Sequence, residues 1–201
     1  MMNMANKSTK TKQEGFTLIE VMIAILVMTI GLLAVIASFA SAIAATQSAE
    51  EDLIARQKAF EAMESIYTAR NSQQIPFASI ANVANGGIFL GGATALLCAG
   101  PDGLVGTADD IACKTQAGAT CPNGGAECMM LPGRDGVLGT ADDQIMSLSN
   151  FTRTITINPV LLASGSTNAN MMGITITVSY TKDGWTKPRQ FAANGLISSY
   201  H

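Results

Sequence analysis

The chain has 201 residues, of which 48% are hydrophobic and 13% are charged, and its formal net charge at pH 7 is −3. The high apolar content excludes a disordered chain, and a charged share far below the about 25% of typical soluble domains argues against a plain cytosolic domain. The acidic balance argues against specific nucleic-acid binding. The single histidine, His201, excludes a histidine-based catalytic triad or a two-histidine metal site within this chain.

An apolar run without charged residues extends from Val21 to Ser48, after a short basic segment with Lys7, Lys10 and Lys12. A helix of roughly 20 residues crosses a bilayer core of ~30 Å, so this run is long enough to span a membrane. It is also longer than the apolar core of a secretory signal peptide, which is roughly 7–15 residues. Basic residues before the run keep that end in the cytoplasm. We therefore expect a single-pass inner-membrane protein whose later residues lie outside the cytoplasm.

One carboxylate, Glu20, lies at the start of this run. An ionisable group within a membrane helix is costly and indicates a function. The alternative is that Glu20 lies among the lipid headgroups, where it costs little.

Residues 15–20 read Gly-Phe-Thr-Leu-Ile-Glu, directly before the apolar run. With this segment, residues 1–45 closely resemble the N-terminus of type IV prepilins and type II secretion pseudopilins, which carry a class III signal. The resemblance implies a leader peptide over 1–15, cleavage after Gly15 by a prepilin peptidase, and methylation of the new N-terminal Phe16. It also implies that Glu20 of one subunit meets the amino terminus of a neighbouring subunit in a filament. The run is most similar to PilV-type minor pilins, and no proline interrupts it.

The helical pattern continues beyond the membrane segment to about Arg70, where Asn71, Ser72 and then Pro76 end it. One helix from about Thr17 to about Arg70 would be roughly 80 Å long at ~1.5 Å per residue. Residues 16–46 form its membrane and polymerisation part, and residues 47–72 its amphipathic part, which packs on a globular head over 73–201. Helical spacing selects six apolar positions for that contact: Leu53, Ile54, Phe60, Met63, Ile66 and Tyr67.

The head contains an internal repeat, G-x-D-G-x-x-G-T-A-D-D, which begins at Gly100 and again at Gly133. Calcium takes six to eight oxygen ligands from flexible, acidic turns, and the pattern resembles calcium loops of some major pseudopilins. The alternative is a pair of capped turns, in which Thr107 and Thr140 act as caps. Both interpretations remain open. The candidate calcium ligands are Asp102, Asp109, Asp110, Asp135, Asp142 and Asp143.

Four cysteines lie in the same part of the head, over 98–145: Cys98, Cys113, Cys121 and Cys128. An even number outside the cytoplasm indicates disulfides. Sequential pairing, Cys98 to Cys113 and Cys121 to Cys128, is the simplest of three connectivities. Zinc is disfavoured because no C-x-x-C spacing occurs.

The remaining sequence, about 150–200, predicts a small antiparallel sheet. Alternating residues predict strands over 151–158 and 174–180, a turn at Lys182–Trp185, a third strand over 185–191 and a fourth over 196–200. Residues 168–172 are expected to form a loop, and a short strand is expected over 88–90. Pro188 marks the third strand as an edge strand. The predicted fold is α+β, a lollipop with a long N-terminal helix packed on the sheet.

The sequence contains no nucleophile–base pair, phosphate-binding loop or redox motif, so an enzyme is not expected. With the resemblance, it predicts a structural minor pilin of a type IV pilus, active in assembly, adhesion or motility, that moves from the inner membrane to the cell surface. Its expected partners are the prepilin peptidase and other pilin subunits. One alternative is a minor pseudopilin of a type II secretion system. Another is a pilus-tip adhesin module with calcium-ordered loops.

Overall fold

The computed structural model describes residues 15–116, 118–181 and 187–200. Most of the predicted leader peptide and the predicted turn at Lys182–Trp185 lie outside these residues. The chain divides into two compact units between Ser48 and Ala49, and each is described by itself. In chain order the elements are α1 Leu18–Asn71, the 3-10 turns η1 Phe77–Ser79 and η2 Val83–Asn85, β1 Ala93–Ala95, α2 Pro122–Gly125, β2 Cys128–Leu131, β3 Gln144–Ser147, β4 Phe151–Leu161, β5 Thr167–Tyr180 and β6 Arg189–Ser198.

The first unit is the apolar part of α1, up to Ser48. Nearly all of its side chains are exposed on every side of the helix, and an apolar window within it is long enough to cross a membrane. A helix that is apolar all round is suited to lipid or to other helices. Its few hydroxyl groups donate back to the helix, as when Ser38 Oγ bonds the Ala34 carbonyl at 2.9 Å and Thr46 Oγ1 the Ala42 carbonyl at 3.0 Å. These bonds lower the cost of placing the hydroxyls in hydrocarbon.

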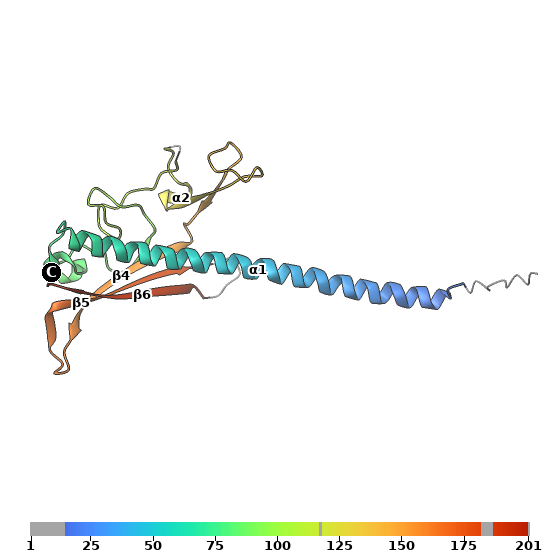
Figure 1. Ribbon diagram of the computed structural model, residues 1–201, viewed down its shortest axis with the longest axis horizontal. Helices are drawn as coiled ribbons and strands as arrows, with labels where there is room; N and C mark the ends of the chain where they lie inside the picture. The colour runs from blue at the N-terminus through green and yellow to red at the C-terminus, as the bar shows by residue number, and fades with distance from the viewer. Residues whose placement is uncertain (1–14, 117, 182–186, 201) are drawn as a thin grey trace, which may run out of the picture. The chain divides into compact units, whose positions relative to one another are not determined.

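The second unit is the head, built on a four-stranded antiparallel sheet in the order β1-β4-β5-β6 (Figure 1). Strands β4 and β5 pair from Phe151 opposite Tyr180 to Pro159 opposite Met172, and the register shifts after Pro159. The face with Ile155, Ile157 and Ile176 is buried. The opposite face carries the threonines that alternate with them, so the period-two pattern of the sequence sets the two faces.

Within the head, α1 from Ala49 onward packs on the buried face of this sheet (Figure 1). The fold is therefore α+β with a helix on an antiparallel sheet, as predicted. Four alanines supply much of the contact surface, and their small side chains let the helix approach the strands closely. The buried helix residues are Ile54, Ala55, Ala59, Ala62, Met63, Ile66, Ala69 and Arg70. The expected stripe was wrong at Leu53 and Phe60, which are 65% and 55% exposed.

The third and fourth predicted strands are one strand, β6, which lies at the edge of the sheet as Pro188 indicated. The predicted break between them was wrong, because the residues of this strand pair with β5 without interruption. Gly195 in this strand lies against the helix. A Cβ atom at Gly195 would lie 2.4 Å from the Tyr67 hydroxyl oxygen and 3.0 Å from the Met63 sulfur. The Tyr67 hydroxyl donates to the Leu196 carbonyl at 3.0 Å and joins the helix to the strand.

Two other local predictions were wrong, and one hairpin was missed. Residues 88–90 form no named strand; Phe89 makes only single bridges, to Asn82 and Thr107, and the short strand lies at β1 instead. Residues 168–172 are part of β5 rather than a loop, since the β4–β5 hairpin extends past the register shift. The β2–β3 hairpin was not predicted, because its four-residue strands are too short to show a period.

Candidate functional site

The Gly15–Phe16 peptide bond lies just before the first helical residue, Leu18. Both residues are exposed, Phe16 to 83%. Thr17 caps the helix, since its backbone carbonyl and its hydroxyl oxygen accept from the Glu20 N–H at 3.1 and 3.3 Å. Exposed backbone outside a helix is where proteases cut most readily, so the cap leaves the bond in an accessible segment.

Glu20 lies in the first turn of α1 and is exposed in the isolated chain. A negative charge is favoured at this end of a helix, where unpaired N–H groups point outward. The sequence reasoning missed the role of Thr17. The signal was present, because Thr-x-x-Glu over residues 17–20 is a capping-box pattern.

Residues 10–36 match the family described as the prokaryotic N-terminal methylation motif. The chain carries a class III signal. This signal is that of type IV pilin-like proteins, which are structural rather than enzymatic, and it implies processing by a prepilin peptidase. Together with the apolar helix it indicates a membrane-anchored pilin-like protein. Comparisons with curated proteins and with solved structures give no match.

Beyond the class III signal, the two acidic repeats form loops that share several internal hydrogen bonds. In the first, the Leu104 N–H donates to Asp102 at 2.8 Å and the Gly106 N–H donates to Asp110 at 2.8 Å. In the second, the corresponding bonds join Val137 to Asp135 at 2.9 Å and Gly139 to Asp143 at 2.6 Å. Each carboxylate thus satisfies the backbone of its own turn.

The threonines of the repeats stabilise the same turns. Thr107 Oγ1 donates to Asp109 and Thr140 Oγ1 to Asp142, each at 2.7 Å. These hydrogen bonds lower the pKa of the Asp109 and Asp142 carboxyls, against a smaller opposing effect of desolvation. The threonine side chains therefore favour the charged form of both loops.

These bonds hold both loops as turns in which aspartates accept the backbone N–H groups. Thr107 and Thr140 do not act as the predicted caps, because their hydroxyls donate to Asp109 and Asp142. Among residues 15–116, 118–181 and 187–200, no group of three or more acidic, histidine or cysteine side chains is arranged to hold a metal ion. The six aspartates lie in two separate loops rather than in one cluster. Calcium binding by either loop stays a prediction.

Two disulfides brace the loop region, Cys98–Cys113 and Cys121–Cys128. This is the sequential pairing. The first disulfide encloses the first acidic loop, and Cys113 and Cys121 are buried. No described cysteine is free.

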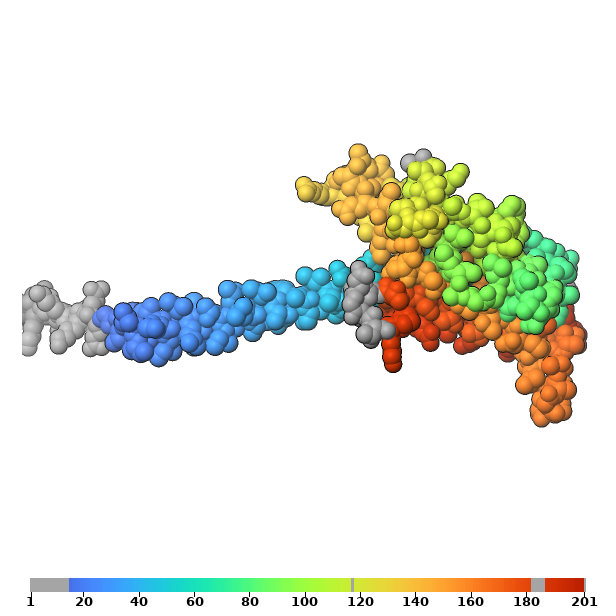
Figure 2. Space-filling model, turned by 180° about the vertical axis from the view of Figure 1, so that it is seen from behind, coloured from blue at the N-terminus to red at the C-terminus, as the bar shows by residue number. Residues whose placement is uncertain are grey.

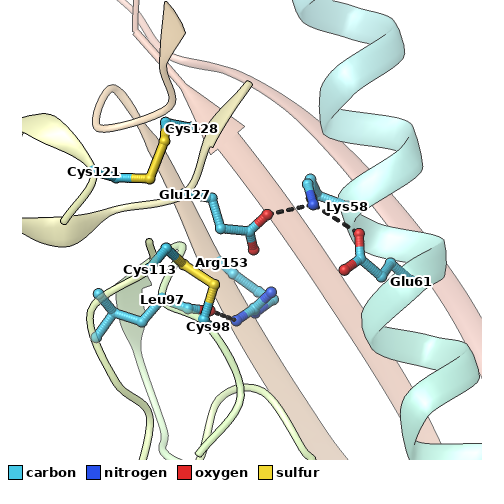
Figure 3. Close-up of a disulfide and its surroundings, with 9 residues drawn as sticks. All are labelled: Lys58, Glu61, Leu97, Cys98, Cys113, Cys121, Glu127, Cys128 and Arg153. Atoms are coloured by element: carbon cyan, nitrogen blue, oxygen red, sulfur yellow. Dashed lines mark hydrogen bonds and ion pairs between the residues drawn. A yellow bond between two sulfur atoms is a disulfide. The ribbon is translucent and has the colours of Figure 1, made fainter. Parts of the chain in front are cut away.

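An ion-pair cluster joins the disulfide region to α1 (Figure 3). Lys58 on the helix pairs with Glu127, next to Cys128, and with Glu61 at 2.8 Å. Burial opposes the charge of Lys58, but the hydrogen bonds to Glu127 and Glu61 outweigh it and raise the pKa of this amine. The cluster was not predicted from the sequence, because Lys58 and Glu127 meet only in the folded head.

A buried arginine lies beside this cluster on β4. Arg153 is 2% exposed, and its guanidinium donates to the Leu97 carbonyl at 3.5 Å (Figure 3). Burial lowers the pKa of Arg153, while the negative charge of Glu127 opposes this shift. Glu127 therefore compensates positive charge from both the helix and the sheet.

Proposed function

We propose that this protein is a structural minor pilin of a type IV pilus, most like PilV-type minor pilins. One observation carries the proposal. The sequence Gly-Phe-Thr-Leu-Ile-Glu lies within the matched segment 10–36 and leads into a helix whose apolar side chains are exposed on every side. Such a helix needs either lipid or neighbouring helices around it.

Polymerisation follows from the same residues. Cleavage after Gly15 gives Phe16 a positively charged amino group, four residues before the carboxylate of Glu20. Within hydrocarbon an unpaired charge is expensive, so Glu20 gains most when it meets the amino group of a neighbouring subunit. When the subunit moves from the inner membrane into a filament, the helices of neighbouring subunits replace the lipid around α1. The Glu20 carboxylate and the amino group of Phe16 are then both paired.

The intact mass and N-terminal sequence of the protein, measured separately in membranes and in sheared surface filaments, test the proposal. A chain that begins at N-methylated Phe16 in the sheared fraction supports a pilus subunit. The same processed chain found only in membranes favours a pseudopilin of a type II secretion system. A chain that still begins at Met1 in both fractions contradicts both assignments.

Deletion of the gene separates the two assemblies further. Loss of surface pili with normal protein export supports the minor pilin, and loss of an exported protein with normal pili supports the pseudopilin. A pilus-tip adhesin is tested with Asp135→Ala. That variant loses binding to a surface while pili stay visible if the second loop is the adhesive contact.

A further inference from the structure

The two acidic repeats are equivalent beyond their sequence motif. An antiparallel bridge between Cys98 and Ile111 closes the first loop. The pair Leu131 and Gln144, at the end of the β2–β3 hairpin, closes the second loop at the corresponding positions. Several internal hydrogen bonds also correspond, those to Asp102 and Asp110 in the first loop and to Asp135 and Asp143 in the second. The second loop adds a bond from the Arg134 N–H to Asp142, which Pro101 cannot make at the same position of the first. The repeat is thus the same structural unit used twice.

The first loop is docked in the head through its apolar pair. Leu104 and Val105 are only 1% and 9% exposed and belong to the hydrophobic core. Beside them the Gly106 carbonyl accepts from the Leu90 N–H at 2.8 Å. The Ile155 side chain packs so closely that a Cβ atom at Gly106 would lie 2.5 Å from its Cδ1. The loop therefore accepts a backbone N–H and buries its apolar pair in the core at the same time.

The second loop presents the same groups to solvent. Val137 and Leu138, at the positions of Leu104 and Val105, are 56% and 58% exposed. In the described part of the chain, no backbone N–H donates to the Gly139 carbonyl, and no atom lies within 4 Å of a Cβ placed at Gly139. Figure 2 shows this loop, in gold near residue 140, projecting from the head.

We propose that the second loop is a docking element for a different protein chain. That chain presents an exposed backbone N–H beside aliphatic side chains, as Leu90 and Ile155 do for the first loop. A second copy of this chain cannot offer the equivalent site, because its own first loop occupies it and the Cys98–Cys113 disulfide encloses that loop. An anionic lipid surface does not fit either, since the loop carries three aspartates and one arginine. The proposal does not depend on which filament contains the protein.

The first test asks whether the two apolar pairs are interchangeable. In the full-length chain, the double variant Leu104→Val with Val105→Leu gives the first loop the Val-Leu sequence that the second loop has at the corresponding positions. We expect its melting temperature to stay close to that of the unmodified protein, while Leu104→Ser with Val105→Ser melts clearly lower. If the exchanged pair lowers melting as much as the serine pair, the loops do not share one docking surface and the proposal is wrong.

The second test places a photoreactive amino acid at Arg134, which is exposed beside the apolar pair, in intact cells. We expect a cross-link to a different protein chain, mapped by mass spectrometry to one site on that chain. Val137→Ser with Leu138→Ser should reduce it at least about tenfold, since two apolar side chains lose their burial. Leu161→Ser is the matched control, because it removes another exposed apolar side chain, 66% exposed, from a different hairpin.

The cross-linking outcomes decide the proposal. A cross-link lost in the Val137 and Leu138 variant but kept in the Leu161 control supports it, provided that the melting temperatures of all three proteins agree. No cross-link, a cross-link only to lipid or to a second copy, or equal yields in the two variants overturns it. A large drop in melting temperature for the Val137 and Leu138 variant also overturns it, because the pair would then pack within its own chain.

Discussion

At the scale of single residues, Gly195 controls how closely the helix approaches the sheet. A methyl group there would meet the Tyr67 hydroxyl at 2.4 Å. We expect Gly195→Ala to destabilise the head by about 1–3 kcal/mol, the usual cost of overpacking a core contact. Denaturant unfolding of the full-length protein in detergent measures this.

Gly173 provides the matched control, because it lies on β5 and a Cβ atom there has only ordinary contacts, the nearest at 3.7 Å. Gly173→Ala should leave the free energy of unfolding unchanged or slightly higher, since alanine lowers the entropy of the unfolded chain. Equal losses in both variants would show that strand glycines matter for another reason than the Tyr67 contact.

Lys58 stabilises the head at neutral pH, and this contribution to the free energy of unfolding is lost at alkaline pH. Its pKa is raised above 10.5 in the folded protein, so its contribution is complete below that value and is lost as pH rises through the folded pKa. Burial raises the pKa of Tyr180, with the Asp52 hydrogen bond acting in the same direction, so this phenol adds a loss of the same sign. We expect the free energy of unfolding to fall as pH rises above about 10, with a smaller slope in Lys58→Met.

The loss in the free energy of unfolding at neutral pH shows which of its two partners matters more to Lys58. Lys58→Met leaves Glu127 largely buried without its cation and should cost about 1–3 kcal/mol. Glu61→Gln should cost less than about 1 kcal/mol, because the Glu61 side chain is 54% exposed. Identical losses from both variants would contradict the view that Glu127 is the main partner.

At the scale of elements, the acidic loops allow a direct test of calcium binding. If either loop binds Ca²⁺, millimolar Ca²⁺ raises the melting temperature relative to a chelator, because a ligand that binds only the folded state stabilises it. Asp142→Asn should reduce the rise if the second loop is the site, and Asp109→Asn if the first loop is. Identical melting curves with Ca²⁺ and with chelator would leave the repeats as turns held by their own hydrogen bonds.

The sequence predicts elements well where a long period specifies them. The helix and the alternating residues of β4 and β5 are examples, since many consecutive residues agree. Prediction failed where tertiary contacts decide. The helix stripe depends on small alanines such as Ala59 and Ala62 that carry little hydropathy signal, and the approach of Gly195 to Tyr67 joins residues far apart in the sequence. The different burial of the two repeats was equally beyond the sequence, because their motifs are the same.

At the scale of the whole molecule, the two units have opposite relations to solvent. The first exposes apolar residues along α1, whereas the head buries its apolar residues between helix and sheet. The class III signal and the apolar helix were predictable from the sequence, because both depend on local patterns, the segment that begins at Gly15 and the charge-free run. Whether each acidic loop is buried or exposed could not be predicted in this way, because it depends on the surfaces that the folded head places beside the loop.

Glu20 should determine whether the processed chain leaves the membrane for a filament. Glu20→Gln keeps the size of the side chain and its place in the first turn, but it removes the charge that would pair with a neighbouring amino group. We expect cleavage after Gly15 to continue and recovery in sheared filaments to fall at least about tenfold, which corresponds to ~1.4 kcal/mol. The measurement is the ratio of processed protein in filaments to processed protein in membranes.

Glu50→Gln is the control, because it removes an exposed carboxylate from the same helix beyond the apolar run. Normal recovery of the Glu20→Gln protein would favour the alternative that Glu20 lies among the lipid headgroups. The pairing of Glu20 with a neighbouring amino group would then have no part in assembly.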